Sequence, residues 1–274
     1  MIRLLGIELQ KLIQNRTSKI LIFISFILPL CVIVLSAIKI DFFGFFTLEL
    51  GALGIYDFPL VYHITTYFSA LFKFFFAIVV VSMVGNEYSN KTLKQNLIDG
   101  LSKKEFILSK FYTIIFFSLI STIIILLISQ ILGFIYSSYD DFSKTLSEME
   151  FILAYFLKLI GFFSLCLFLS VLAKRSAFAL AFLFINFLFE WIIYGLFVWK
   201  FDIQFAEKIQ NFFPLKSMSN LIKQPFRRIA MNKFPFNTNL NYDYSVHFQD
   251  CIVVVGWIII SIYLSYYILK IRDL

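Results

Sequence analysis

Long apolar runs separated by short polar segments dominate the pattern of this chain. A helix needs about 20 mostly apolar residues to cross a hydrocarbon layer of roughly 30 Å. Six runs reach this length, namely residues 20–38, 61–85, 111–136, 151–173, 177–199 and 251–269. We therefore expect an all-α membrane protein with six transmembrane helices. The rest of the chain has no stretch long and apolar enough for a separate soluble core, so residues 1–274 are expected to form a single transmembrane domain.

The composition agrees with this pattern. Hydrophobic residues make up 60% of the chain and charged residues only 15%, with a mean hydropathy of +0.86. Soluble domains carry about 25% charged residues, so the soluble class is excluded. The first apolar run is longer than the apolar part of a typical signal peptide and is interpreted as a retained span. The three cysteines lie inside spans without a CxxC spacing, and we expect no metal site.

Basic residues are distributed unevenly among the connecting segments. With the amino terminus in the cytoplasm, thirteen Lys and Arg residues lie on that side, and the two short outer loops contain only Lys39 and Lys144. Cytoplasmic loops are rich in Lys and Arg, so both termini are expected in the cytoplasm. The outer loop 200–250 carries seven more, but long loops follow this rule weakly. The net charge of +7 thus indicates topology and contact with anionic membrane lipid, and nucleic-acid binding is not expected.

The polar segment 86–110 lies between the second and third spans. Leu93, Leu97 and Leu101 recur every four residues, which predicts a short helix with an apolar stripe. Gly100 supplies a left-handed helix stop. The stretch from Ser102 to Glu105 has the SxxE form of a capping box, so a new helix is predicted to begin there and continue into the third span. An ordinary solvated loop does not need such a stripe, whereas a partner protein covering the leucines would explain it.

This segment resembles the connection between spans two and three of type 2 ABC transporter permeases. The matching positions are Glu87, Thr92, Leu93, Ser102, Lys103 and Lys110. Two positions depart from the family pattern, because Lys91 stands where many members have Gly and Gly100 lies near a position often occupied by Pro. The six spans, the cytoplasmic termini and the long outer loop also fit, so the resemblance covers the whole chain.

The resemblance implies a permease subunit of the bacterial inner membrane in which segment 86–110 contains the coupling helix. In the family, this helix docks on a separate cytoplasmic ABC ATPase subunit. The residues implied for docking are Glu87, Thr92, Leu93, Leu97, Leu101, Ser102 and Lys103. We expect a homodimer, or a heterodimer with a second permease, that moves an unidentified substrate, most simply by export. A non-transporting membrane scaffold or assembly factor of the same fold that recruits an ATPase is the alternative.

The chain itself is not expected to be an enzyme. A GxxxxGK[ST] phosphate loop needs two glycines five residues apart, and none of the ten glycines meets this spacing. No catalytic residues are assigned, and no cofactor is expected on this chain. ATP and Mg would be bound by the partner ATPase.

The first 18 residues predict an amphipathic helix at the inner membrane surface. Leu5, Leu9 and Leu12 follow one helical face, whereas Gln10 and Lys11 are among the polar residues expected to face away. The family resemblance implies a connecting helix beside the coupling helix.

Three ionisable residues lie inside spans, where each costs about 2.5 to 3.5 kcal/mol on insertion scales. They are Lys73, Lys158 and Glu190. At 1.5 Å per residue, all three lie roughly 20 Å from the cytoplasmic ends of their spans. Glu190 is therefore able to pair with one of the lysines and hold the spans together, or the three line a translocation cavity. The residue pattern does not decide between these two roles.

Three prolines divide the loop 200–250 into short pieces in which apolar and basic residues alternate. The pieces either fold back into the membrane as short helices or rest on the outer headgroups, and we favour a lid over a cavity.

Overall fold

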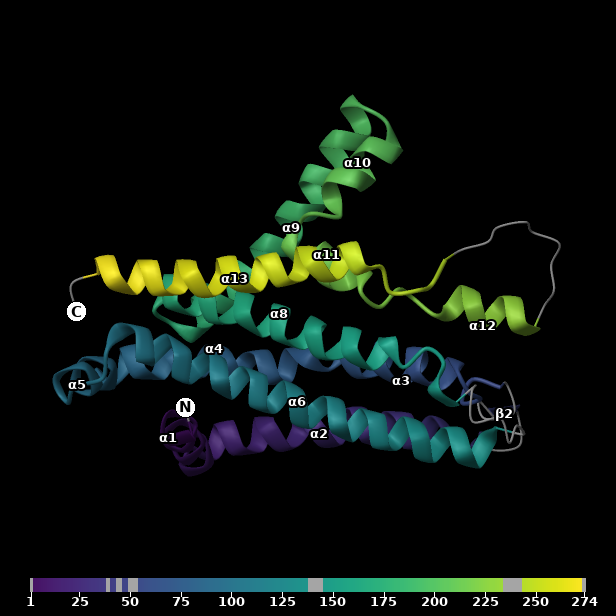
Figure 1. Cartoon of the computed structure of the whole chain (residues 1–274), viewed down its shortest axis with the longest axis horizontal. Coiled ribbons are helices and arrows are strands. Elements are labelled where there is room, and N and C mark those ends of the chain that lie inside the picture. The colour runs from purple at the N-terminus through teal and green to yellow at the C-terminus, as the bar shows by residue number, and fades with distance from the viewer. Residues whose placement is uncertain are drawn as a thin grey trace.

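The computed structural model describes residues 2–37, 40–42, 46–48, 54–137, 145–233 and 243–272, and these form an elongated helical bundle (Figure 1). Lys39, Lys144 and the end of the first predicted span lie outside the described residues, as do residues 234–242 of the outer loop. A short antiparallel pair of strands, β1 (Ile40–Phe42) and β2 (Phe46–Leu48), accompanies the helices. The expectation of an all-α membrane protein is thus confirmed, with this small hairpin as an addition.

Five described helices are long and apolar enough to cross a membrane. They are α2 (Arg16–Ala37), α6 (Lys103–Tyr136), α8 (Glu150–Ala173), α9 (Ser176–Lys200) and α13 (Phe248–Ile271). The run 61–85 folds as two helices, α3 (Leu60–Leu71) and α4 (Lys73–Ser89), which are bent by 46° at Phe72. The count is six if this bent pair is one span. The break was not predicted, because no Pro or Gly stands there.

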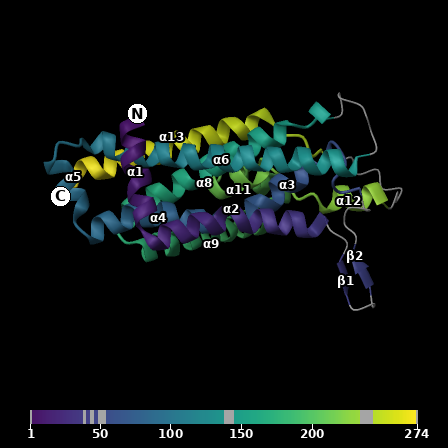
Figure 2. The same cartoon turned by 90° about the horizontal axis from the view of Figure 1, so that it is seen from below.

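Helix α8 forms the centre of the bundle and packs against α4, α6, α9 and α13. Close packing on α8 depends on Gly161, where an added Cβ would lie 2.9 Å from Val254 Cγ1 of α13. By contrast, α2 and α9 are mostly exposed within this chain. They lie on either side of α4, and both run along the lower edge of the view in Figure 2. One face of the bundle is therefore made by α2, α4 and α9.

The two described chain ends and the short helix α5 (Thr92–Ile98) lie at the same end of the bundle (Figure 1). Helix α1 (Ile2–Gln14) runs across the axis of α2 there, as Figure 2 shows. It is shorter than the predicted helix 1–18 because Asn15 ends it. The Asn15 Oδ1 atom accepts hydrogen bonds from the backbone N–H groups of Thr17 (3.0 Å) and Ser18 (3.3 Å), which starts α2.

The described part of the loop after α9 contains three short helices, α10 (Ile203–Gln210), α11 (Pro214–Asn220) and α12 (Phe226–Lys233). Helix α11 packs against α8, α9 and α13, and its Met218 side chain is fully buried. The start of α11 lies beside Glu190. Glu190 is ten residues before the end of α9, so the chain after α9 has turned back along this helix by roughly 15 Å. Of the two alternatives for this loop, folding back into the bundle holds for α11.

Candidate functional site

Segment 86–110 folds into α5 and the start of α6. Lys91, the residue before α5, has a φ of 59°, the left-handed conformation that glycine adopts most easily. The position where the family pattern favours Gly is therefore one at which the backbone needs a positive φ. Gly100 follows α5 with a φ of 98°, so the predicted left-handed stop is confirmed.

The predicted capping box at the start of α6 is also confirmed. The Glu105 backbone N–H donates to Ser102 Oγ at 3.2 Å, and the Ser102 N–H donates to Glu105 Oε2 at 2.9 Å. Each side chain thus satisfies a backbone group that the first turn of a helix leaves without a partner. The box fixes where α6 begins relative to α5.

Two of the three leucines in the stripe, Leu93 and Leu101, face inward, whereas Leu97 is partly exposed. Leu93 is 2% exposed and belongs to the main hydrophobic core, and Leu101 is partly buried against that core. Leu93, which we expected to face a partner, packs on the chain's own helices in this structure. The exposed apolar side chain of α5 is instead Ile98, at 76% exposure.

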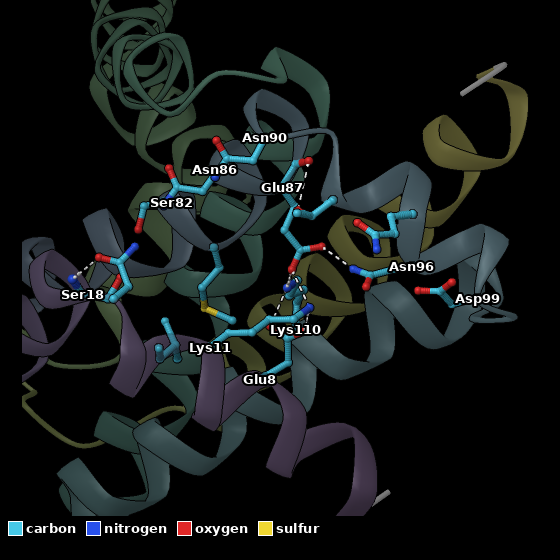
Figure 3. A pocket seen from close by; sticks show the side chains of 15 residues that line it. Glu8, Lys11, Ser18, Ser82, Asn86, Glu87, Asn90, Asn96, Asp99 and Lys110 are labelled. Atoms are coloured by element: carbon cyan, nitrogen blue, oxygen red, sulfur yellow. Dashed lines mark hydrogen bonds and ion pairs between the residues drawn. The ribbon is translucent and has the colours of Figure 1, made fainter.

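Four charged side chains meet beneath α5 (Figure 3). We call Glu8, Lys11, Glu87 and Lys110 the charge cluster. Lys110 of α6 is 1% exposed, and its Nζ pairs with both Glu8 of α1 and Glu87 of α4. Lys11 Nζ lies 3.1 Å from Glu87 Oε1 and 3.3 Å from Glu8 Oε1. Each carboxylate therefore contacts both ammonium groups.

The charge cluster contains two carboxylates and two ammonium groups, so its formal charges cancel. Burial by itself lowers the pKa of Lys11, but the carboxylates of Glu8 and Glu87 outweigh this effect and hold that pKa above its ordinary value. Lys11 therefore stays charged throughout the physiological range. Removing one buried partner would leave charge without compensation in a poorly solvated site, which is costly.

Helix α5 is attached directly to the charge cluster. Asn96 Nδ2 donates to Glu87 Oε2 at 3.2 Å, and Thr92 Oγ1 donates to the Glu87 carbonyl at 3.5 Å. Glu87 and Thr92, two residues expected to dock a partner, thus link helices of this chain. The charge cluster and these bonds join α1, α4, α5 and α6. A cavity of about 340 Å³ beside them is also lined by Ser82, Asn86 and Asp99 (Figure 3).

Lys103 connects a second set of helix ends. Its Nζ donates to the backbone carbonyls of Arg272 at 3.0 Å and Lys270 at 3.3 Å, at the end of α13. The Arg272 guanidinium in turn donates to the Leu172 carbonyl of α8 at 2.9 Å. Basic side chains thus satisfy the free carbonyls at the ends of two spans.

The three ionisable residues inside the spans do not meet as expected. Both Glu190 carboxylate oxygens accept backbone hydrogen bonds from the start of α11, from Leu215 N at 2.9 Å and Lys216 N at 3.0 Å. Within the described residues Glu190 has no ion pair with Lys73 or Lys158, so the pairing hypothesis is wrong. Glu190 instead caps α11. The sequence gives the depth of a residue in its span, but it does not reveal which helix the side chain faces. Lys73 Nζ lies 4.2 Å from the centre of the Phe162 ring, which is one helical turn after Lys158 on α8.

Sequence reasoning did not find Glu8 or Asn96, and it placed Lys11 on the face turned away. A signal for Glu8 was present, since it lies three residues after Leu5 and four before Leu12, on the apolar face of α1. A single carboxylate on such a face needs a buried cation. Its partner Lys110 is 102 residues away, and only the packing of α1 on α6 reveals it.

The bundle of apolar helices is that of a multi-pass membrane protein. The charge cluster links the short helix α5, which is not one of the spans, to the second and third spans. A family model described as "ABC-2 family transporter protein" matches residues 4–274. The chain belongs to this family, so it is a membrane permease component of an ABC transporter, and the predicted resemblance is confirmed. A comparison with curated proteins finds no match.

Proposed function

We propose that the chain is the membrane-spanning subunit of an ABC exporter of the bacterial inner membrane, driven by ATP hydrolysis in a separate ATPase subunit. The observation that supports this most directly is the attachment of α5 to α1, α4 and α6 through the charge cluster. In this proposal α5 is the coupling helix. ATP and Mg bind to the ATPase, and the residues of this chain transmit its movement.

The contact between α5 and the charge cluster is suited to passing a movement of α5 to the spans, because it is short and buried. A displacement of α5 moves Asn96, which is bonded to Glu87 of α4, and Glu87 is paired with Lys110 of α6. Leu93 adds an apolar contact between α5 and the core. The movement therefore reaches the second and third spans together.

The docking surface in this proposal is the exposed side of α5 and the turn after it, with Ile98 at its centre. Lys94, Asp99 and Ser102, which lie within four residues of Ile98 in the sequence, are also exposed. Of the residues first expected to dock, Leu97 and Lys103 are partly exposed and lie at the margin. Glu87, Thr92, Leu93 and Leu101 act from the inner side by holding α5 in place.

A second permease, identical or related, is proposed to pack on the face made by α2, α4 and α9. The two spans that are least buried within this chain both lie on this face. Lipid covers the remaining apolar surface. The distribution of Lys and Arg supports an arrangement with α5 and both termini in the cytoplasm.

The test is recovery of the ATPase with tagged permease variants. Burying an Ile side chain contributes roughly 1.5 to 3 kcal/mol, which corresponds to about tenfold to a hundredfold in affinity. Ile98→Asp removes this contribution and adds a charge, so the ATPase should be lost from the purified complex. Ile98→Leu is the matched control and should retain it. Equal recovery with both variants would mean that Ile98 does not dock the ATPase.

A further inference from the structure

A cavity of about 400 Å³ lies between α3, α11 and α12. Helices α3 and α12 are toward the end of the bundle opposite α5 (Figure 1). The lining includes Lys216, Lys223 and Arg227 and, among the described residues, no carboxylate. We call this cavity the basic pocket. Cations of one sign around a hollow with poorly polarisable walls concentrate a positive potential inside it, so the basic pocket attracts anions.

The backbone beneath two of these cations is fixed by buried side chains of other helices. The Lys216 N–H of α11 donates to Glu190 Oε2 of α9 at 3.0 Å. The Lys223 carbonyl accepts a hydrogen bond from Nε2 of His63, a fully buried residue of α3, at 2.8 Å. Both lysines therefore start from defined positions at the wall of the pocket.

Arg227 is positioned by its two neighbours on α12. The Phe226 ring packs edge-on against the Tyr67 ring of α3, with 6.0 Å between their centres. The Arg228 guanidinium forms an ion pair with Glu148, just before α8. Arg228 is thus neutralised within the protein, whereas Arg227 lines the basic pocket.

The charges in the basic pocket are only partly compensated. Neither Lys216 nor Arg227 forms an ion pair within the part of the chain that the structure describes. Glu190 attracts Lys216 electrostatically, but its oxygens accept backbone hydrogen bonds from α11. Lys223 is better compensated, because its Nζ donates to the Asp243 carbonyl at 2.8 Å and the Asp243 carboxylate also attracts it. Lys216 and Arg227 therefore give the pocket its positive charge.

The basic pocket has the size of a small-molecule site, since such sites occupy about 300 to 1,000 Å³. Besides the three cations, hydroxyl groups, amides and aromatic rings line it, among them Ser219, Asn220, Gln224, Tyr67 and Phe226. Hydroxyl and amide groups can bind the alcohol part of a ligand, and the rings offer apolar contact. The expected ligand is thus an anionic group attached to a small polar body.

We propose that the basic pocket binds a phosphate monoester, with the phosphate on Lys216, Lys223 and Arg227. A phosphate monoester carries about 1.5 to 2 negative charges and three strong acceptor oxygens, so it matches several cations better than a carboxylate does. The ester is the headgroup of a membrane lipid or a soluble molecule, and basic pockets between membrane helices do bind anionic headgroups. The site is separate from the charge cluster and does not depend on docking of an ATPase.

The test measures thermal unfolding of the purified full chain in an uncharged detergent. Glycerol 3-phosphate is the soluble probe and dihexanoyl phosphatidic acid is the lipid probe. Their comparisons, at equal ionic strength, are glycerol and dihexanoyl phosphatidylcholine. A ligand that binds only the folded protein raises its midpoint temperature. At least one probe should therefore raise the midpoint of the wild-type protein, and neither comparison should.

The variants Arg227→Gln and Lys216→Gln test the assigned residues with the probe that responds. In each, the concentration for half of the rise should increase by about tenfold, the loss of one charge-assisted hydrogen bond. Lys208→Gln, at an exposed position of α10 outside the basic pocket, is the matched control and should respond like the wild type. A wild-type response in both pocket variants would overturn the proposal. An equal loss of response in Lys208→Gln would overturn it too, because it would indicate general charge attraction.

Arg227 also separates a binding role from a structural one. Its side chain is exposed, so Arg227→Gln should unfold at the wild-type temperature without a probe, and Arg227→Lys should keep most of the response. A lower midpoint for Arg227→Gln with an unchanged response would show a structural role and overturn the proposal. Glycerate, which carries a carboxylate, should be at least about tenfold weaker than glycerol 3-phosphate.

The two probes distinguish the sources of the phosphate. A response to glycerol 3-phosphate assigns the site to a soluble ester, and a response to dihexanoyl phosphatidic acid alone assigns it to a lipid headgroup. A wild-type protein that responds to neither would refute the site. Recovery of the ATPase tests the coupling proposal separately, and Arg227→Gln should leave that recovery unchanged.

Discussion

Replacement of Lys110 by Met should loosen the junction between α5 and the spans. The side chain is 1% exposed and pairs with two carboxylates that are themselves almost fully buried, Glu8 and Glu87. Breaking a buried ion pair by removing one partner costs about 3 to 5 kcal/mol. Lys11 still contacts both carboxylates in the variant, and its side chain is 39% exposed, so we expect the lower end of this range.

The assay is a double-mutant cycle with Glu87→Gln, with the free energy of unfolding measured by circular dichroism during denaturant titration. The double variant leaves Glu8 paired with Lys11, so its formal charges cancel again. It should lose less stability than the two single variants together, by about 1 to 3 kcal/mol. Lys104→Met, at an exposed position of the same helix, should change stability by less than about 0.5 kcal/mol. Additive effects within about 0.5 kcal/mol would show that Lys110 and Glu87 do not stabilise each other.

Two further predictions concern the spans and their orientation. Glu190→Ala removes a charged acceptor from two backbone N–H groups of α11, so it should lower the free energy of unfolding by about 1.5 to 3 kcal/mol. A double-mutant cycle with Lys158→Met should show no coupling between the two residues. A coupling energy above about 0.5 kcal/mol would restore the pairing hypothesis. In a cysteine-free background, an impermeant thiol reagent added to intact cells should label a cysteine at Lys208 and not one at Ser102. The reverse pattern would invert the orientation and place α5 outside the cell.

Features that depend on neighbouring residues could be predicted well. The five unbroken spans follow from apolar length alone, and the capping box of Ser102 and the stop at Gly100 follow from local backbone chemistry. The leucine stripe indicated an amphipathic helix correctly. The inward direction of Leu93 and Leu101 could not be predicted, because an apolar face packs equally well on a partner or on the chain's own core.

Composition and the lengths of the apolar runs require a membrane bundle, and segment 86–110 carries the family pattern, so the class of the protein can be read without coordinates. Which charges meet depends on how the helices pack. Glu8 and Lys110 are brought together across 102 residues, Glu190 faces α11, and Lys73 lies at an unexpected break in the second span. Helical periodicity sets the face and depth of a residue, whereas its partner depends on how whole helices pack, which is a property of the entire bundle.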